Sequence, residues 1–186
     1  MIPFTCVDNF FKYPDVVRKY ALAQPFFKHS NYPYRGHPIK GKAWPGTRTK
    51  ELRDINKPLF DQLCNKIFAL FYDFKTTSVA WNVSAVFHLT DSSHQNFKNR
   101  IHQDQSGTSG LIYLTPNINK EAGTTLYDKN KKETLIIKNL YNRMILYDGT
   151  FFHGPTRCVN DRLCLVFYVD RLHSLTLPPL ERLKAY

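Results

Sequence analysis

The sequence predicts an α+β fold, mainly β, in which N-terminal helices pack on one sheet of a β-sandwich or jelly roll. Amphipathic segments are confined to the first part of the chain. After about residue 76 the sequence consists of some eight short runs of β-branched and aromatic residues, separated by Gly, Pro, Asn and Asp. A chain of 186 residues with 42% apolar and 15% aromatic residues is sufficient for one buried core and short for two.

Two amphipathic segments predict the helices. Residues 13–24 form the first, with Asp15 near its start, and residues 57–74 form the second and stronger one, with Asn56 or Thr49 as a candidate cap. Between them, residues 31–50 are rich in Pro, Gly and aromatic residues and have no helical or strand period. Long loops of this kind in compact domains are often lids or binding segments, so we expect a functional loop here.

The short runs in the second part of the chain predict the strands. They cover residues 79–89, 99–104, 109–116, 123–129, 133–140, 142–149, 151–156 and 162–171. We therefore expect one domain over residues 1–186, with helical support over about 1–75, a β domain over about 76–172 and a tail over 173–186.

The charge of the chain is basic and unevenly distributed. The formal net charge is +11, residues 16–50 contain no Asp or Glu, and residues 128–138 add a second basic segment. Such a field attracts anions, among them nucleic acid, phosphorylated metabolites and acidic protein segments. Solubility with unspecific polyanion affinity explains the charge equally well.

Cysteine spacing and hydropathy indicate the cellular compartment in which the protein works. The four cysteines form no C-x-x-C pair, which is typical of idle thiols in a reducing cytoplasm. No apolar run approaches the roughly 20 residues that span a bilayer, and the start of the chain does not have the pattern of a secretion signal. We expect a cytoplasmic protein, in the host cytoplasm if it is viral.

His102 and Asp104 are the first candidates for a functional site. They are two residues apart at the end of an expected strand, where side chains at i and i+2 face the same way. His153 ends another apolar run and precedes a Gly-Pro turn. Two histidines and one carboxylate form the facial triad of mononuclear non-haem Fe(II) oxygenases, although the same donors also suit zinc or manganese.

Arg162 and Tyr113 are the candidates for binding a second ligand. Arg162 opens an apolar strand in which Leu163, Leu165 and Phe167 share one face, whereas Arg162, Cys164, Val166 and Tyr168 share the other. An inward arginine in such a strand needs an anionic partner, and the far carboxylate of 2-oxoglutarate fits a guanidinium fork. Tyr113 follows the His-x-Asp pair on the next strand, from which its hydroxyl reaches the same carboxylate.

Together these motifs resemble the Fe(II)/2-oxoglutarate dioxygenases. The shared features are His-x-Asp, a distal His about fifty residues on, and an Arg nine residues beyond it. The prolyl-4-hydroxylase-like branch is similar in a further Tyr-Leu pair, here Tyr113-Leu114, and in a Gly-Gly-x-Leu element, here replaced in part by "EAGTTLYD". The resemblance covers roughly residues 79–171. The segments "VDNFFKYPDVVRKYAL" and "WPGTRT" are also similar to uncharacterised members from phages and marine bacteria.

The resemblance implies a double-stranded β-helix, cupin-like, with iron at its open end. It implies His102, Asp104 and His153 as metal ligands, Arg162 and Tyr113 as cosubstrate-binding residues, and Fe(II), 2-oxoglutarate and O2 as cofactors, with ascorbate as reductant. Halogenase relatives lack the carboxylate ligand so that a halide can bind, so the presence of Asp104 favours hydroxylation.

The substrate stays open among three hypotheses. The motif spacing and the long loop favour a peptide or protein side chain. The basic N-terminal third favours a nucleic acid or a phosphorylated small molecule, although no base-flipping or groove-reading motif accompanies it. A non-enzymatic β-helix that serves as a binding or structural module is the third hypothesis.

Overall fold

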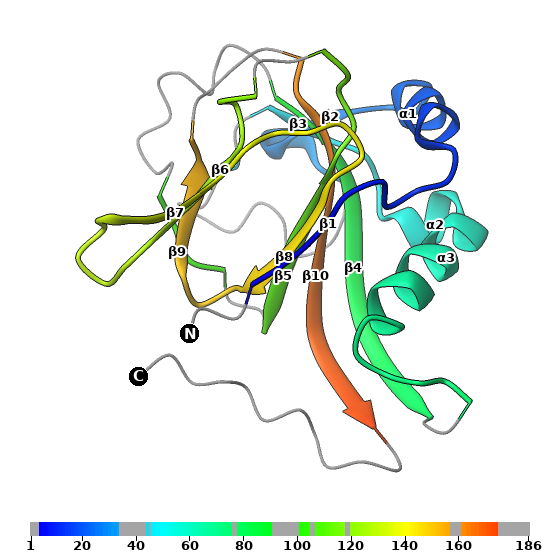
Figure 1. Ribbon diagram of the computed structural model, residues 1–186. Coiled ribbons are helices and arrows are strands. Elements are labelled where there is room, and N and C mark those ends of the chain that lie inside the picture. Colours follow the sequence, from blue (N-terminus) through cyan, green and yellow to red (C-terminus); the bar gives the residue numbers. More distant parts are fainter. Residues whose placement is uncertain are drawn as a thin grey trace.

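The computed structural model describes residues 4–33, 44, 46–75, 78–90, 101–104, 107–117, 120–156 and 161–174, with the backbone alone for 171–174. Two sheets face each other, and the helices lie outside the larger one (Figure 1). In chain order the elements are β1 Phe4–Val7, α1 Pro14–Leu22, β2 Phe27–Lys28, the 3-10 helix η1 His29–Asn31, β3 Thr47–Arg48, α2 Leu52–Ile55, α3 Lys57–Phe68, β4 Val79–Leu89, β5 Thr108–Tyr113, β6 Thr124–Tyr127, β7 Glu133–Ile137, β8 Met144–Asp148, β9 Phe152–Pro155 and β10 Leu163–Ser174.

The sheets have the topology of a double-stranded β-helix. The large sheet has seven strands in the order β1-β8-β5-β10-β4-β3-β2, and the small sheet has three in the order β7-β6-β9. The pairings within both sheets are antiparallel. The predicted fold class, a mainly β structure with N-terminal helices packed on one sheet, is therefore confirmed.

Local sequence signals explain how the helices begin. Pro14 opens α1, and Val17 and Ala21, one turn apart, are its buried residues. Asn56 caps α3, because its side-chain oxygen accepts a hydrogen bond from the Leu59 amide at 3.1 Å. Of the two candidate caps, Asn56 is thus the one that caps this helix.

Helix α3 is shorter than its apolar period predicts. The period continues to residue 74, but the helix ends at Phe68 in a turn that is closed by the Phe71 amide bonding to the Phe68 carbonyl. Leu70, Phe71 and Phe74 are all more than two-fifths exposed. Since most helical stability comes from packing an apolar face, the segment in which Tyr72 is buried but Leu70, Phe71 and Phe74 stay exposed does not continue the helix.

The β part follows the predicted strands with two differences. The segment 99–104 does not form a strand in its described part, residues 101–104, where His102 makes only an isolated bridge to His153. The first part of the chain, expected to be helical, also contributes β1, β2 and β3 to the large sheet. Most of the predicted 31–50 loop lies outside the described residues.

The hydrophobic core has two parts on opposite faces of the large sheet. The larger part lies between the helices and the sheet and includes Phe68, Phe87 and Phe167, each buried. The smaller part lies between the two sheets and includes Leu126 and Ile145. The inner space between the sheets is therefore the place where polar groups from both sheets can meet. No helix in the described part of the chain is long and apolar enough to cross a membrane.

Gly123 allows the two strands of the β6–β7 hairpin to approach each other closely. A Cβ placed on it would lie 1.7 Å from the Ile137 carbonyl oxygen, so no other residue fits without a backbone shift. The Gly123 carbonyl in turn accepts a long hydrogen bond, 3.4 Å, from Nη2 of Arg162. This glycine thus lies where the small sheet meets the interior arginine.

Candidate metal centre

His102 and His153 face each other across a backbone bridge. The amide of each donates to the carbonyl of the other, at 2.9 and 2.8 Å, and their ring centroids are 4.4 Å apart. His153 also pairs with Leu126 of β6, whose side chain belongs to the core between the sheets. Because directly paired residues project to the same side of a sheet, both imidazoles point into this interior.

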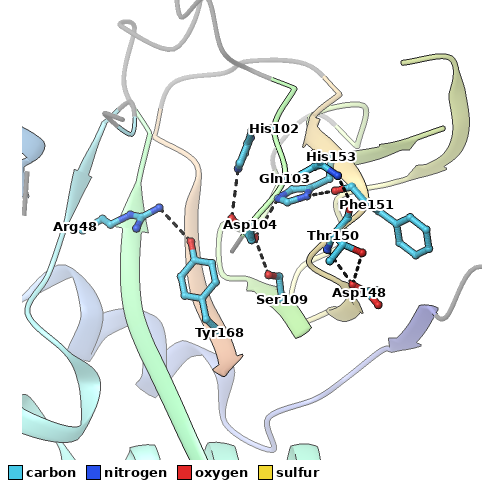
Figure 2. A network of polar contacts seen from close by, with 10 residues as sticks. All are labelled: Arg48, His102, Gln103, Asp104, Ser109, Asp148, Thr150, Phe151, His153 and Tyr168. Atoms are coloured by element: carbon cyan, nitrogen blue, oxygen red, sulfur yellow. Dashed lines mark hydrogen bonds and ion pairs between the residues drawn. The ribbon is translucent and has the colours of Figure 1, made fainter. Parts of the chain in front are cut away.

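Asp104 joins the two histidines from the segment that follows His102. Its amide bonds to the Gly149 carbonyl at 2.8 Å. Its Oδ1 lies 3.8 Å from Nε2 of His102, and its Oδ2 lies 3.3 Å from Nε2 of His153. Figure 2 shows the carboxylate between the two rings, with the Ser109 hydroxyl donating to Oδ2 at 2.6 Å.

The protonation states of these groups favour metal binding. Nδ1 of His153 lies 2.9 Å from the Phe151 carbonyl, which can only accept, so Nδ1 is the donor of this bond and Nε2 is the ring nitrogen that faces Asp104. Burial alone would raise the pKa of Asp104, but the hydrogen bonds and charges of His153 and the Ser109 hydroxyl hold it below its usual value. The carboxyl group is therefore ionised at neutral pH.

The three side chains form one possible metal-binding group. One donor atom from each lies within 4.8 Å of the others, and no other such group occurs within the ranges the structure describes. Two imidazole nitrogens and one carboxylate oxygen on one side of a cation leave its remaining positions open, as in the facial triad of non-haem iron sites. The His102 side chain is 48% exposed, so the open side has access to solvent.

Arg162 lies in the same interior and has no acidic partner among the described residues. It is buried, and its Nε has no hydrogen-bond partner among the described residues. Its guanidinium carbon lies 5.2 Å from the centre of the Tyr113 ring. No carboxylate in the described ranges forms an ion pair with it, although burying an unpaired charge is costly. The donor set thus fits an added anion.

Tyr113 lies beside this guanidinium. Its side chain is fully buried, and its hydroxyl is 2.8 Å from the Thr124 hydroxyl of the small sheet. Burial raises the pKa of Tyr113 to about 12, so the group stays protonated and can donate a hydrogen bond. The predicted pair of Arg162 and Tyr113 therefore meets in space.

Tyr147 lies between the His102–Asp104–His153 triad and the Arg162–Tyr113 pair. Its ring centroid is 4.8 Å from that of His153. Burial raises its pKa well above the usual value, the negative charge of Asp104 adds to this, and the positive charge of Arg162 opposes it. Tyr147, which contacts His153, and Tyr113, which contacts Arg162, belong to the same core between the sheets, so the structure brings the triad and Arg162 to one interior.

Sequence reasoning missed four residues of this interior. Ser109 and Thr124 bond to predicted site residues, whereas Tyr147 and Arg48 extend the polar surroundings. Ser109 was within reach of the sequence, because it lies four residues before Tyr113 on the same strand and so shares its face. Arg48 was not, because it lies in a segment without any periodic pattern.

The comparisons with known proteins agree with this architecture. No family model matches the chain, and no curated protein sequence matches it. Several solved structures do match. One is a prolyl hydroxylase from Trichoplax adhaerens in complex with a peptide fragment of hypoxia inducible factor. Its TM-score is 0.61 at 14% identity, over 91% of this chain and 84% of that one.

Two further structures match to a similar degree. An oxidoreductase of the 2OG-Fe(II) oxygenase family from Burkholderia pseudomallei gives a TM-score of 0.58 at 12% identity, over 90% of this chain and 84% of that one. HygX from Streptomyces hygroscopicus, with nickel and 2-oxoglutarate bound, gives 0.57 at 12% identity, over 90% and 83%. The chain therefore shares the fold of 2OG-Fe(II) oxygenases. The likeness of its N-terminal segments to phage and marine bacterial proteins stays a prediction.

Proposed function

We propose that this protein is an Fe(II)- and 2-oxoglutarate-dependent dioxygenase that hydroxylates a side chain of a peptide or protein. The observation that carries the proposal is the shared interior of the triad and Arg162, in which three metal-binding side chains lie in the same space as a buried guanidinium that has no acidic partner among the described residues. A metal site alone would not require that arginine.

Each residue has a defined part in this reaction. His102, Asp104 and His153 hold the iron, and the Phe151 carbonyl keeps His153 in the tautomer that can bind it. Arg162 binds the far carboxylate of 2-oxoglutarate in a fork, with the Tyr113 hydroxyl as a second donor. Bound iron with 2-oxoglutarate and O2 supplies the oxidising chemistry, with ascorbate as reductant, and the protein positions the reactants and insulates them.

Asp104 separates hydroxylation from halogenation. A halogenase keeps the position of the carboxylate open for a halide, whereas here Asp104 lies within 4 Å of both imidazoles and is hydrogen-bonded by Ser109. A filled third position leaves no room for the halide on this face of the metal. The product we expect is therefore a hydroxylated side chain.

The choice of a peptide substrate rests on the prolyl-4-hydroxylase-like motifs and on the Trichoplax structure, which holds a peptide fragment. The basic segment gives weaker support to a nucleic acid or a phosphorylated small molecule. Arg18 in that segment donates to the Leu114 carbonyl and the Thr115 hydroxyl. This cation of the basic segment thus has partners within the protein.

Turnover of 2-oxoglutarate tests the proposal. The purified protein, supplied with Fe(II), ascorbate and 2-oxoglutarate, is expected to release succinate and to show a visible charge-transfer band when the complex is prepared without oxygen. Asp104→Ala should abolish both signals, and Asp170→Ala, which removes an exposed carboxylate of β10, should preserve both. Succinate release by Asp104→Ala at the rate of the wild-type protein would refute the assignment.

A further inference from the structure

A second arginine lies on the same inner side of the large sheet as Arg162. Arg48 of β3 pairs with His88 of β4, which in turn pairs with Cys164 of β10, a residue of the core between the sheets. Paired residues project to the same side, so Arg48 points into the interior. Figure 2 shows its guanidinium aimed at the triad, with Tyr168 between it and Asp104.

Aromatic contacts fix the guanidinium of Arg48 in place. Its central carbon lies 4.3 Å from the centre of the Trp44 ring, at the distance of a cation–π contact. Its Nη2 donates to the Tyr168 hydroxyl at 3.3 Å. A fork that is held in this way loses little rotamer entropy when it binds a ligand.

Within the part of the chain that the structure describes, Arg48 has no acidic partner, as is true of Arg162. Its Nε is buried and makes no hydrogen bond within the described ranges. Nor does any carboxylate in those ranges form an ion pair with it. A guanidinium that is partly removed from water and contacts an indole ring and a phenol has unused donors that suit an anion.

Tyr168 adds a donor to the same place. Its oxygen accepts from Arg48, so the hydroxyl proton is directed elsewhere. Burial raises the pKa of this phenol, the nearby charge of Arg48 lowers it and that of Asp104 raises it, with a net increase, so the proton is retained. Arg48 and Tyr168 thus form a pair of donors beside the triad.

We propose that Arg48 and Tyr168 bind a carboxylate of the substrate and thereby select peptides with an acidic residue next to the oxidised position. The inference rests on the proposed function and deepens it, since Arg162 is reserved for 2-oxoglutarate and a second anion is needed for Arg48. A single fork carries one positive charge, which matches one carboxylate better than a doubly charged phosphate. The Arg48–Tyr168 pair is then the specificity determinant on the substrate side of the iron.

Tryptophan fluorescence can report on this site. Trp44 stacks on Arg48, and the other tryptophan of the chain, Trp81, packs on Phe68 and can be replaced by Phe. The Trp81→Phe protein, loaded with Fe(II) and 2-oxoglutarate without oxygen, is titrated with two pools of short capped peptides. One pool has a fixed Glu among neutral residues, and the matched pool has Gln at that position.

We expect the Glu pool to change Trp44 fluorescence with an affinity at least about tenfold higher than the Gln pool, as is usual for charge-assisted hydrogen bonds. Arg48→Gln should remove this difference in affinity. Arg48→Lys should reduce it, because the positive charge remains but the bidentate guanidinium geometry is lost. Arg53→Gln, which replaces an exposed arginine of α2, should preserve it. Equal affinity for both pools in the wild-type protein would overturn the proposal.

The other outcomes are also decisive. One such outcome is that Arg48→Gln lowers the affinity for 2-oxoglutarate, measured by titrating the visible charge-transfer band, and leaves the preference for Glu peptides intact. Arg48 would then bind the cosubstrate, and the proposal would be wrong. If Arg48→Gln fails to fold, as judged by thermal melting, the Arg48→Lys titration decides. If the visible band never forms, the proposed function fails, while the comparison of the two pools still tests the carboxylate site.

Discussion

The two faces of the large sheet differ in chemistry, although they are built from alternate residues of the same strands. On β10, Leu163, Leu165 and Phe167 face the helices and are fully buried in hydrocarbon. Their neighbours Arg162 and Tyr168 lie on the inner side, where Nε of Arg162 has no hydrogen-bond partner among the described residues. One face therefore supplies stability, and the other holds groups that a ligand completes.

This division has an energetic basis. Burying one large apolar side chain stabilises a fold by roughly 1.5–3 kcal/mol, and the helix-facing core contains many of them. A buried charge such as that of Arg162 costs free energy until it is paired. The helix-facing side thus compensates for the cost of a buried charge in the interior, and substitutions on the two faces should affect different measurements.

Loss of a metal ligand should have the largest effect and should leave the helix-facing core intact. His153→Ala removes a buried imidazole whose Nε2 lies 3.3 Å from Asp104. Removing a residue that only supports a metal ligand lowers metal affinity roughly 10–100-fold, so we expect removal of the ligand itself to lower Fe(II) affinity by more than that. Succinate release should vanish. Calorimetric titration with Fe(II) without oxygen measures the affinity. Retained affinity would contradict the ligand assignment.

The converse substitution lies in β10 of the large sheet, on the side that faces the helices. Phe167→Ala removes a fully buried ring that covers Gly110, where an added Cβ would lie 2.3 Å from the ring. We expect the free energy of unfolding to fall by about 3–5 kcal/mol, with the Fe(II) affinity of the folded protein unchanged. Urea unfolding measures this, and Phe167→Leu serves as the milder variant. A loss below about 1 kcal/mol would mean that this face does not dominate stability.

The sequence predicts the helix-facing side and the order of the elements well, because both depend on local periodicity. The strand over residues 79–89 matches β4, and the alternation in β10 places Arg162 and Leu163 on the correct faces. His102 and Asp104 do meet, but not through the alternation of a continuous strand. A bridge to His153 and a bond to the Gly149 carbonyl place them instead.

The parts that sequence reasoning missed depend on distant partners. β3 has two residues, Thr47 and Arg48, too few for any period, and it forms because the edge of β4 offers hydrogen bonds. The same contact carries Arg48 into the interior. Helix α3 ends early for the opposite reason, since its continuing apolar period lacks a surface to cover. Tertiary contacts decide both cases, and no local pattern records them.

The hydroxyl of Ser109 on the inner face offers a finer test of the difference between the two faces. Ser109 donates to Asp104 at 2.6 Å, and Ser84 on the same face donates to Glu51, also at 2.6 Å. Ser109→Ala should weaken Fe(II) binding roughly 10–100-fold because the metal ligand loses its orienting bond. Ser84→Ala is the matched control and should leave Fe(II) affinity unchanged. If both variants bind Fe(II) as the wild type does, Ser109 does not orient the carboxylate.

The smallest expected effect concerns an ion pair that belongs to neither face. Arg143 donates from Nε and Nη2 to the two oxygens of Asp8, at 2.6 and 2.9 Å, where β1 meets β8. The hydrogen bond from Arg143 lowers the pKa of Asp8, against a small opposing effect of burial. The Asp8 side chain is 52% exposed, so solvent screens the pair, and we expect Asp8→Asn to lower the free energy of unfolding by only about 0.5 kcal/mol at pH 7.

The pH dependence of this difference follows from the direction of the pKa shift. Because the folded protein holds the pKa of Asp8 below its unfolded value of about 3.9, the stabilisation is complete above that value and is lost as the pH falls through the folded pKa. Urea unfolding of the two proteins should therefore differ at pH 7 and converge in strong acid, with Fe(II) affinity at neutral pH the same in both. A difference that persists in acid would show that Asp8 stabilises the β1–β8 edge through packing or backbone contacts and not through its charge.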